Sequence, residues 1–306
     1  MPELDKRNTQ IYTVPEIYRN VRESLLSSKQ DSRKASVKSR RGQPHEDDPP
    51  DHRADRNGLQ LPRTSDISPW TDYKKSYELR LGIGIRVVVA VQKNFPYDEV
   101  TVREFSDSNI EDKLRVLKEN RHPNIVSILD IFRFEEKAYV ILEHMPLSLH
   151  HLSQSRLPLD DIQLAAIVGQ ILRGFLHLFT SGLEPKRLSS SNILVHPTGI
   201  IKIAGHENFT FLSSASDKPR NLLWLSEITM ELMQGYVKED GLIGVNDPGR
   251  WSPDTLSFLS DTTCTASVKG LMKHPFLQLP WTIEMLKEPI SFAMLSVHRG
   301  YKYPLG

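Results

Sequence analysis

Residues 184–209, EPKRLSSSNILVHPTGIIKIAGHENF, hold the side chains that could act on a charged substrate. Glu184 and Glu207 supply carboxylate oxygens and Asn192 supplies an amide oxygen, which are ligand types that magnesium accepts. Arg187 stands between them, and a guanidinium is always charged and carries no acceptor atom, so it cannot take a proton. The stretch therefore offers oxygen ligands for a metal beside a permanent positive charge.

The elements that must position these side chains follow from the hydrophobic periodicity. The pattern predicts strands over 77–94, 100–105 and 122–145, a small hairpin over 192–203, and helices over 109–120, 159–182, 221–235, 252–259 and 266–273. Asp160 and Gln163 form a capping box at the start of the long helix, and Gly182 can end it. A sheet-rich half before a helical half indicates an α+β arrangement with a cleft between two lobes.

Residues 1–68 differ in composition from the rest of the chain. Mixed charges, serine and proline dominate 28–66, which predicts a mostly disordered tail over 1–68. Residues 11–29 have apolar positions at helical spacing and predict a short amphipathic helix, which either docks on the domain or a partner, or forms only transiently. The basic cluster at 33–42 could be a nuclear signal, a phosphorylation site at Ser36 or a solvated charge run.

Composition excludes several classes of protein. The chain has 306 residues, 39% of them apolar, and a net charge of +1, so it shows no global bias toward nucleic acid or an anionic membrane. Its one cysteine, Cys264, rules out an intramolecular disulfide framework and fits a reducing compartment. The sequence predicts no transmembrane segment and no signal peptide. We therefore expect an intracellular protein, cytoplasmic or nuclear, that binds neither nucleic acid nor membrane.

Five short motifs occur in a characteristic order between residues 121 and 277. They are RHPNIV (121–126), YVILEHM (139–145), LSSSNILV (188–195), IKIA (201–204) and LMKHPFL (271–277). Their order and approximate spacing resemble those of a eukaryotic protein kinase domain, nearest to the sterile (STE) group of serine/threonine kinases. The resemblance implies a bilobal fold, with a β-rich lobe over 69–145 and a helical lobe over 146–306.

Within this resemblance, the functional positions of the first lobe are only partly filled. Gly82 and Gly84 stand in a shortened glycine-rich loop, and Arg103 replaces the lysine that meets the phosphates. Thr101 replaces the small residue that faces an adenine ring. Lys113 falls at the position of the helix glutamate, so we expect it to repel Arg103, and the ion pair of an active kinase cannot form.

The second lobe departs further from the family pattern. Arg187 stands at the position of the proton-accepting aspartate, and Gly205 at that of the metal-binding aspartate of the D-F-G motif. Asn192 matches a metal-ligand position, and its alternative role is that of a turn asparagine. The hinge backbone around Glu143–Met145 could still meet an adenine edge.

The chain after Gly205 is too short for a full activation segment ending in A-P-E, and Asn221 and Thr265 replace two residues that anchor the family's substrate platform. We therefore expect a catalytically inactive pseudokinase that acts through a protein partner, with no metal and with at most weak, metal-independent ATP binding. Two alternatives stay open: an atypical active serine/threonine kinase that uses Glu207 or Glu184 with Asn192, and a truncated or decayed kinase gene product.

Overall fold

The computed structural model describes residues 63–105, 110–119, 121–212, 222–264 and 267–299. All of them belong to the second of two compact units, Arg53–Gly306. Several sequence-based predictions fall on residues outside this description, namely the tail as far as residue 62, the helix at 11–29, the basic cluster at 33–42, the shortened segment over 213–221, and Thr265.

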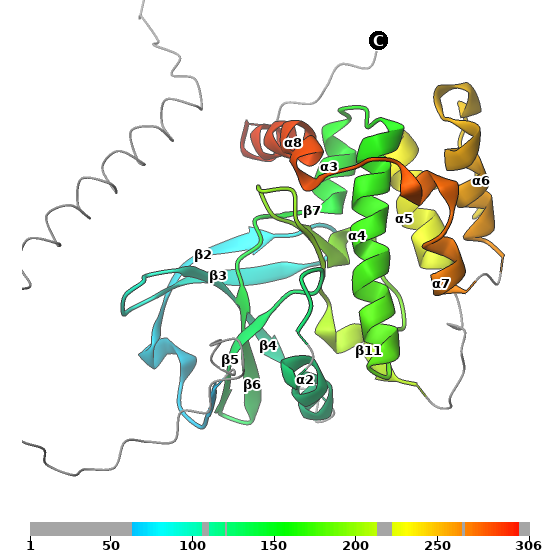
Figure 1. Cartoon of the computed structure of the whole chain (residues 1–306). Coiled ribbons are helices and arrows are strands. Elements are labelled where there is room, and N and C mark those ends of the chain that lie inside the picture. Colours follow the sequence, from blue (N-terminus) through cyan, green and yellow to red (C-terminus); the bar gives the residue numbers. More distant parts are fainter. Residues whose placement is uncertain (1–62, 106–109, 120, 213–221, 265–266, 300–306) are drawn as a thin grey trace, which may run out of the picture. The chain divides into compact units, whose positions relative to one another are not determined.

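The first half of the described chain is built around one six-stranded sheet (Figure 1). Its elements are β1 (Arg63–Ser65), the 3-10 helix η1 (Pro69–Thr71), β2 (Tyr73–Arg80), β3 (Arg86–Gln92), β4 (Glu99–Phe105), α2 (Ile110–Glu119), β5 (Ile128–Phe134) and β6 (Lys137–Glu143). The strand order is β1-β5-β6-β4-β3-β2, with β1 parallel to β5 and the other neighbours antiparallel. β3 and β4 are rich in valine, whose branched side chain packs well on a pleated surface.

Strand β1 lies within the segment that the sequence places in the tail. It pairs with β5 at the edge of the sheet, and Thr64 lies opposite Ile131. Arg63 Nε donates to Asp130 Oδ1 at 3.3 Å, while Tyr73 donates its hydroxyl to Asp130 Oδ2 at 2.7 Å. The expected start of the folded lobe at residue 69 is therefore too late, because these contacts hold three earlier residues against the sheet.

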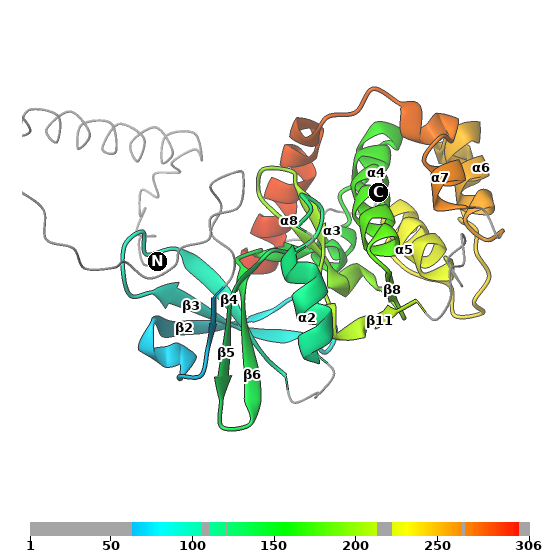
Figure 2. The same cartoon turned by 60° about the horizontal axis from the view of Figure 1, so that its bottom comes forward.

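The second half of the described chain is mainly helical. Its elements are β7 (Leu147–Ser148), α3 (Leu149–Ser155), α4 (Asp161–Thr180), β8 (Leu183–Pro185), η2 (Ser190–Asn192), β9 (Ile193–Val195), β10 (Ile201–Ile203), η3 (His206–Asn208), β11 (Phe209–Phe211), α5 (Leu223–Gln234), η4 (Pro248–Arg250), α6 (Pro253–Asp261), α7 (Val268–Leu271), η5 (Pro275–Gln278), η6 (Ile283–Leu286) and α8 (Lys287–Arg299). In Figure 1 and Figure 2, α2 lies beside the sheet, whereas α3, α4, α5 and α8 gather together.

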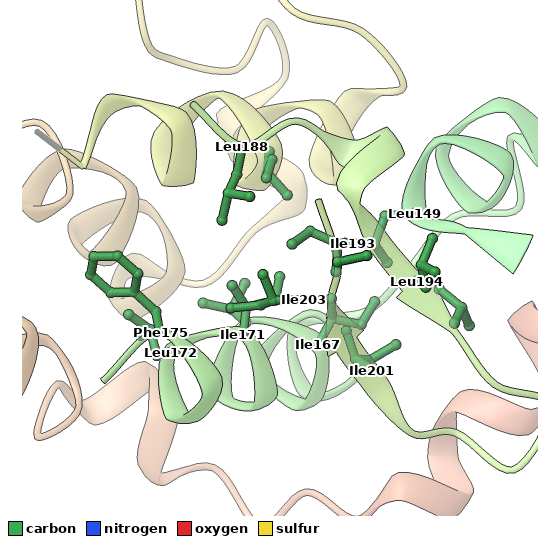
Figure 3. Packing of buried hydrophobic residues seen from close by; sticks show 14 of the residues in the cluster. Leu149, Ile167, Ile171, Leu172, Phe175, Leu188, Ile193, Leu194, Ile201 and Ile203 are labelled. Atoms are coloured by element: carbon green, nitrogen blue, oxygen red, sulfur yellow. The ribbon is translucent and has the colours of Figure 1, made fainter. Parts of the chain in front are cut away.

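The core of the helical half lies between α4 and the hairpin formed by β9 and β10. Figure 3 shows Ile167 and Ile171 of α4 beside Ile201 and Ile203 of β10, and the structure buries all four completely. Completely buried apolar side chains of this size each stabilise a fold by about 1.5–3 kcal/mol relative to exposure. This packing fixes the position of the β9–β10 hairpin. Asn192 lies just before its first strand, and Gly205 lies shortly after its second strand.

Helix α4 confirms the predicted capping box. Asp160 Oδ1 accepts a hydrogen bond from Gln163 N at 2.7 Å, and Gly182 follows the helix end in the left-handed conformation with φ of 78°. By length and composition α4 could span a membrane, but 67% of that stretch is buried inside the domain. Such burial is typical of a core helix.

Candidate functional site

The strand cation Arg103 and the helix cation Lys113 both bind the same residue, Glu207. Arg103 Nη1 lies 2.9 Å from Glu207 Oε1, and Lys113 Nζ donates to the Glu207 carbonyl oxygen at 3.2 Å. The Arg103 and Glu207 side chains are 21% and 27% exposed, so solvent screens this pair only in part. The sequence predicted mutual repulsion between the two cations and missed their shared partner, which joins β4, α2 and η3.

Glu207 reaches this position because the chain turns sharply at Gly205. Gly205 has a φ of 81°, and Asn208 N donates to its carbonyl oxygen at 2.8 Å, which closes the turn η3. A Cβ at Gly205 would lie 3.1 Å from Asn192 Nδ2, closer than an ordinary contact. Position 205 therefore combines a left-handed backbone with a close neighbour, and both conditions favour glycine over aspartate.

Asn192 is the residue that matched a metal-ligand position. Its Oδ1 accepts hydrogen bonds from Ser189 N at 3.3 Å and from Ser189 Oγ at 3.1 Å, and its backbone oxygen accepts from Ala204 N at 2.8 Å. The side chain is buried and forms the capping box of η2. The geometry is that of a turn asparagine, the alternative role that the sequence left open.

The glycine loop lies directly on η2. Ile83 N donates to Ser191 Oγ at 3.3 Å, and a Cβ at Gly82 would stand only 2.1 Å from that same oxygen. No side chain fits in that space, so the glycine at 82 allows the loop and the 190–192 turn to touch. Gly84 is also left-handed, with a φ of 74°, but nothing lies within 4 Å of its missing Cβ.

The space enclosed beneath this loop has a volume of only about 20 Å³. Its walls include Leu81, Val87 and Thr101 from the sheet, and Leu194 and Gly205 from the helical half. Cavities that bind drug-sized ligands measure about 300–1,000 Å³, whereas one water needs about 10–15 Å³. Thr101 and Arg103, which the sequence assigns to a nucleotide cleft, line this space, and in this conformation it admits nothing larger than a water molecule.

At the end of β6, where the hinge begins, Glu143 forms an ion pair with Lys202. Lys202 Nζ lies 2.6 Å from Glu143 Oε1 and 2.8 Å from Oε2, and Ser127 N donates to Oε1 at 2.6 Å. Met145 is buried, with 1% of its surface exposed. Thr101 is buried at the neighbouring wall, where its hydroxyl lies 3.3 Å from His144 Nδ1. Sequence reasoning missed the partner of Glu143, because Lys202 is 59 positions away along the chain.

Arg187 lies outside the closed cavity and lines a second, open groove with a volume of about 590 Å³. This exposed arginine shares the groove with Glu231, whose carboxylate accepts hydrogen bonds from Ser153 Oγ at 2.8 Å and Ser190 Oγ at 2.9 Å. Burial alone would raise the pKa of Glu231, but hydrogen bonds from His150, Ser190 and Ser153 hold the pKa below its ordinary value. This carboxylate therefore stays ionised and anchors the 190–192 turn to α3 and α5.

His206 occupies the middle position of the Gly205-His206-Glu207 triplet. It is 1% exposed, its Nε2 lies 3.2 Å from the Val126 carbonyl oxygen, and its Nδ1 is buried without a hydrogen-bond partner among the described residues. Burial lowers the pKa of His206 to about 4, so the imidazole is neutral at pH 7. The ring serves as packing between the two lobes rather than as a proton carrier.

Comparison with known proteins agrees with this arrangement of lobes. Residues 86–221, less than half of the chain, match the family model of the protein kinase domain. Over these residues the chain is similar to a protein kinase domain. Its β-rich lobe precedes a helical lobe, as the sequence predicted.

Curated relatives of this kinase-like domain include mitogen-activated protein kinases. Over 97 residues it is 34% identical to mitogen-activated protein kinase sma-5 of Caenorhabditis elegans, covering 30% of this chain and 19% of the relative. Extracellular signal-regulated kinase 1 of Dictyostelium discoideum is 29% identical over 130 residues, covering 38% and 25%. Mitogen-activated protein kinase HOG1 of Exserohilum turcicum is 38% identical over 92 residues, covering 30% and 28%. The chain thus matches between about a fifth and somewhat over a quarter of each relative's length.

Proposed function

We propose that this kinase-like domain is a pseudokinase, a protein-binding or regulatory module that does not transfer phosphate. The observation that carries the proposal is the pairing of Glu207 with Arg103 at 2.9 Å. Glu207 is the carboxylate that could replace the missing metal-binding aspartate, and here it neutralises the cation that would meet a phosphate. Arg103 could bind a phosphate of ATP and Glu207 could bind its metal ion, but here the two side chains are paired with each other.

Three further features support the absence of catalysis. Arg187 stands where a proton acceptor is needed and has no acceptor atom. Gly205 offers only backbone to a metal ion that prefers carboxylate oxygens. The cavity of about 20 Å³ leaves no room for a nucleotide unless the glycine loop lifts from Ser191. Losses at the base, the metal site and the nucleotide site each cost orders of magnitude in rate.

The relatives also indicate which class of partner this module would bind. Their names describe mitogen-activated and extracellular signal-regulated protein kinases, so a protein partner in signalling is the natural ligand class for this module. The motifs suggested that the chain is most similar to the STE group. The relatives found are mitogen-activated protein kinases, so similarity to the STE group stays a prediction. We place the partner in an intracellular compartment, as the single cysteine suggests.

One observation favours the alternative of an atypical active kinase. Glu207 Oε2 is buried and has no hydrogen-bond partner among the described residues, so one carboxylate oxygen remains open to a cation. Binding there would require the cleft to open and Arg103 to turn toward phosphate. The alternative therefore predicts a metal-dependent ATP site that relies on Glu207.

A thermal-shift titration of the full chain with ATP, with and without magnesium, separates the two proposals. A pseudokinase should show a Tm shift below about 1 °C at micromolar ATP, unchanged by EDTA, because stabilisation grows only as RT ln(1 + [L]/Kd). A parallel assay with labelled ATP should detect no phosphate on the chain or on a generic substrate.

Two variants sharpen this experiment. If Glu207→Gln abolishes a large, EDTA-sensitive shift seen in the parent chain, the alternative is correct and the pseudokinase proposal fails. Labelled phosphate that disappears in Asn192→Ala would lead to the same conclusion. Arg187→Ala serves as the matched control, since this arginine does not line the closed cavity.

A further inference from the structure

A pocket near the β1 edge of the sheet, on the same face as the closed cleft but lined by different residues, carries a concentration of positive charge. It lies between α2 and strands β1, β5 and β6, and has a volume of about 390 Å³. Leu114, Ile131 and Ala138 form its apolar floor. Its charged lining is Asp112, Arg115, Lys118 and Arg133, which gives a net charge of +2.

Thr64 of β1 projects into this pocket. Its hydroxyl Oγ1 accepts a hydrogen bond from Lys118 Nζ at 3.1 Å, which links β1 to α2 across 54 positions of the chain. Side chains alternate between the two faces of a strand, so Arg63 and Ser65 face the opposite way. Arg63 accordingly binds Asp130 and Asp72 on that other face, and those two carboxylates are already paired.

We propose that Thr64 is a phosphorylation site and that this pocket holds the phosphate in place. A phosphothreonine carries a charge of about −1.5 to −2 and three strong acceptor oxygens, which matches the net charge of the pocket. A separate protein kinase would supply the group from ATP: the bond from Oγ1 to the γ-phosphorus forms, the β–γ anhydride bond breaks, and ADP and the hydroxyl proton leave. Thr64 is exposed on a three-residue edge strand, so the donor enzyme can reach it.

Lys118 is the residue that would respond most. Burial lowers the pKa of Lys118, because part of its surroundings excludes water. A phosphate on Thr64 would convert its present neutral acceptor into a charged one, and charge-assisted hydrogen bonds are roughly twice as strong as neutral ones. Arg115, whose present partner Asp112 lies 3.7 Å away on an exposed surface, can turn toward the new charge at little cost.

The expected consequence is a tighter attachment of β1 to α2. Helix α2 also supplies Lys113 to Glu207, so the phosphate would stabilise the same helix that helps to close the cleft. This inference does not depend on the proposed function, because a phosphate at Thr64 would bind the pocket in an active or an inactive domain.

The test uses the full chain with phosphothreonine encoded at position 64. At low salt its Tm should exceed that of the unmodified chain by about 3 °C, in line with 2–4 °C per kcal/mol for a domain of this size. The gain should fall by about half in 0.5 M salt, where exposed charges are screened. Phosphoserine at position 65 is the matched control, since it faces away from Lys118 and should produce no such gain.

Lys118→Met decides whether the pocket is responsible. The difference between the phosphorylated and unmodified forms should shrink to below about 1 °C in this background, since the variant keeps the aliphatic chain and removes the charge. An equal gain with and without Lys118, no gain at Thr64, or an equal gain from phosphoserine at 65 would each overturn the proposal.

Discussion

Replacing Gly205 with alanine tests whether the position of the missing metal-binding aspartate can accept any side chain. The residue has a φ of 81°, a conformation that costs an L-residue about 1–2 kcal/mol. The added Cβ would also lie 3.1 Å from Asn192 Nδ2, and that side chain cannot move freely because its oxygen caps η2. We expect Gly205→Ala to lower the free energy of unfolding by about 2–3 kcal/mol, the sum of backbone strain and a tight contact.

Gly241 provides a matched control. Its φ is 73°, close to that of Gly205, and nothing lies within 4 Å of its missing Cβ. Gly241→Ala should therefore show the backbone cost alone, about 1–2 kcal/mol. In Tm, about 6 °C should be lost at position 205 and about 3 °C at position 241, at 2–4 °C per kcal/mol.

Urea unfolding followed by tryptophan fluorescence measures both variants under the same conditions. Equal losses at the two positions would refute the role of the Asn192 contact. A Gly205→Asp variant that is as stable as the parent chain would refute the larger inference, namely that the backbone here excludes a metal-binding aspartate.

Two further predictions concern buried charge. Because burial lowers the folded-state pKa of His206 to about 4, the unfolded chain binds more protons between about pH 6.5 and 4, and stability is lost as the pH falls through that window. In His206→Phe, the acid-induced loss of unfolding free energy should be smaller by up to roughly 3 kcal/mol. Urea midpoints measured against pH test this, and a profile equal to that of the parent chain would contradict the burial argument. Lys202→Met should cost about 1–2 kcal/mol, because Glu143 would lose its ion-pair partner in a half-buried hinge, and the double variant with Glu143→Gln should recover part of that loss.

Regular elements were predictable where the chain carries a strong local signal. The valine-rich strands β3 and β4, the helix α4 and its Asp160 cap all came from periodicity and capping chemistry. Strand β1 was not predictable, because three polar residues carry no period and are held by Asp130, far away in sequence. Its position is decided by tertiary contacts alone.

The candidate site was predictable in its residues but not in its connections. The sequence located Arg103, Gly205 and Asn192, all of which line the cavity. It could not pair Arg103 with Glu207, since that contact depends on the turn η3 and on the left-handed backbone at Gly205. Nor could composition reveal how closely Gly82 approaches Ser191, which determines the volume of the cavity.

A guanidinium in place of an amine at position 103 affects how this protein can be detected in cells. A nucleotide analogue that carries an acylating group needs a nucleophilic amine beside it, and no lysine lines the small cavity of the described structure. An immobilised ATP-competitive inhibitor needs a pocket much larger than this cavity of about 20 Å³. The proposed pseudokinase would therefore escape chemical surveys of kinases that rely on either reagent, and its abundance would be followed with antibodies or by direct peptide sequencing.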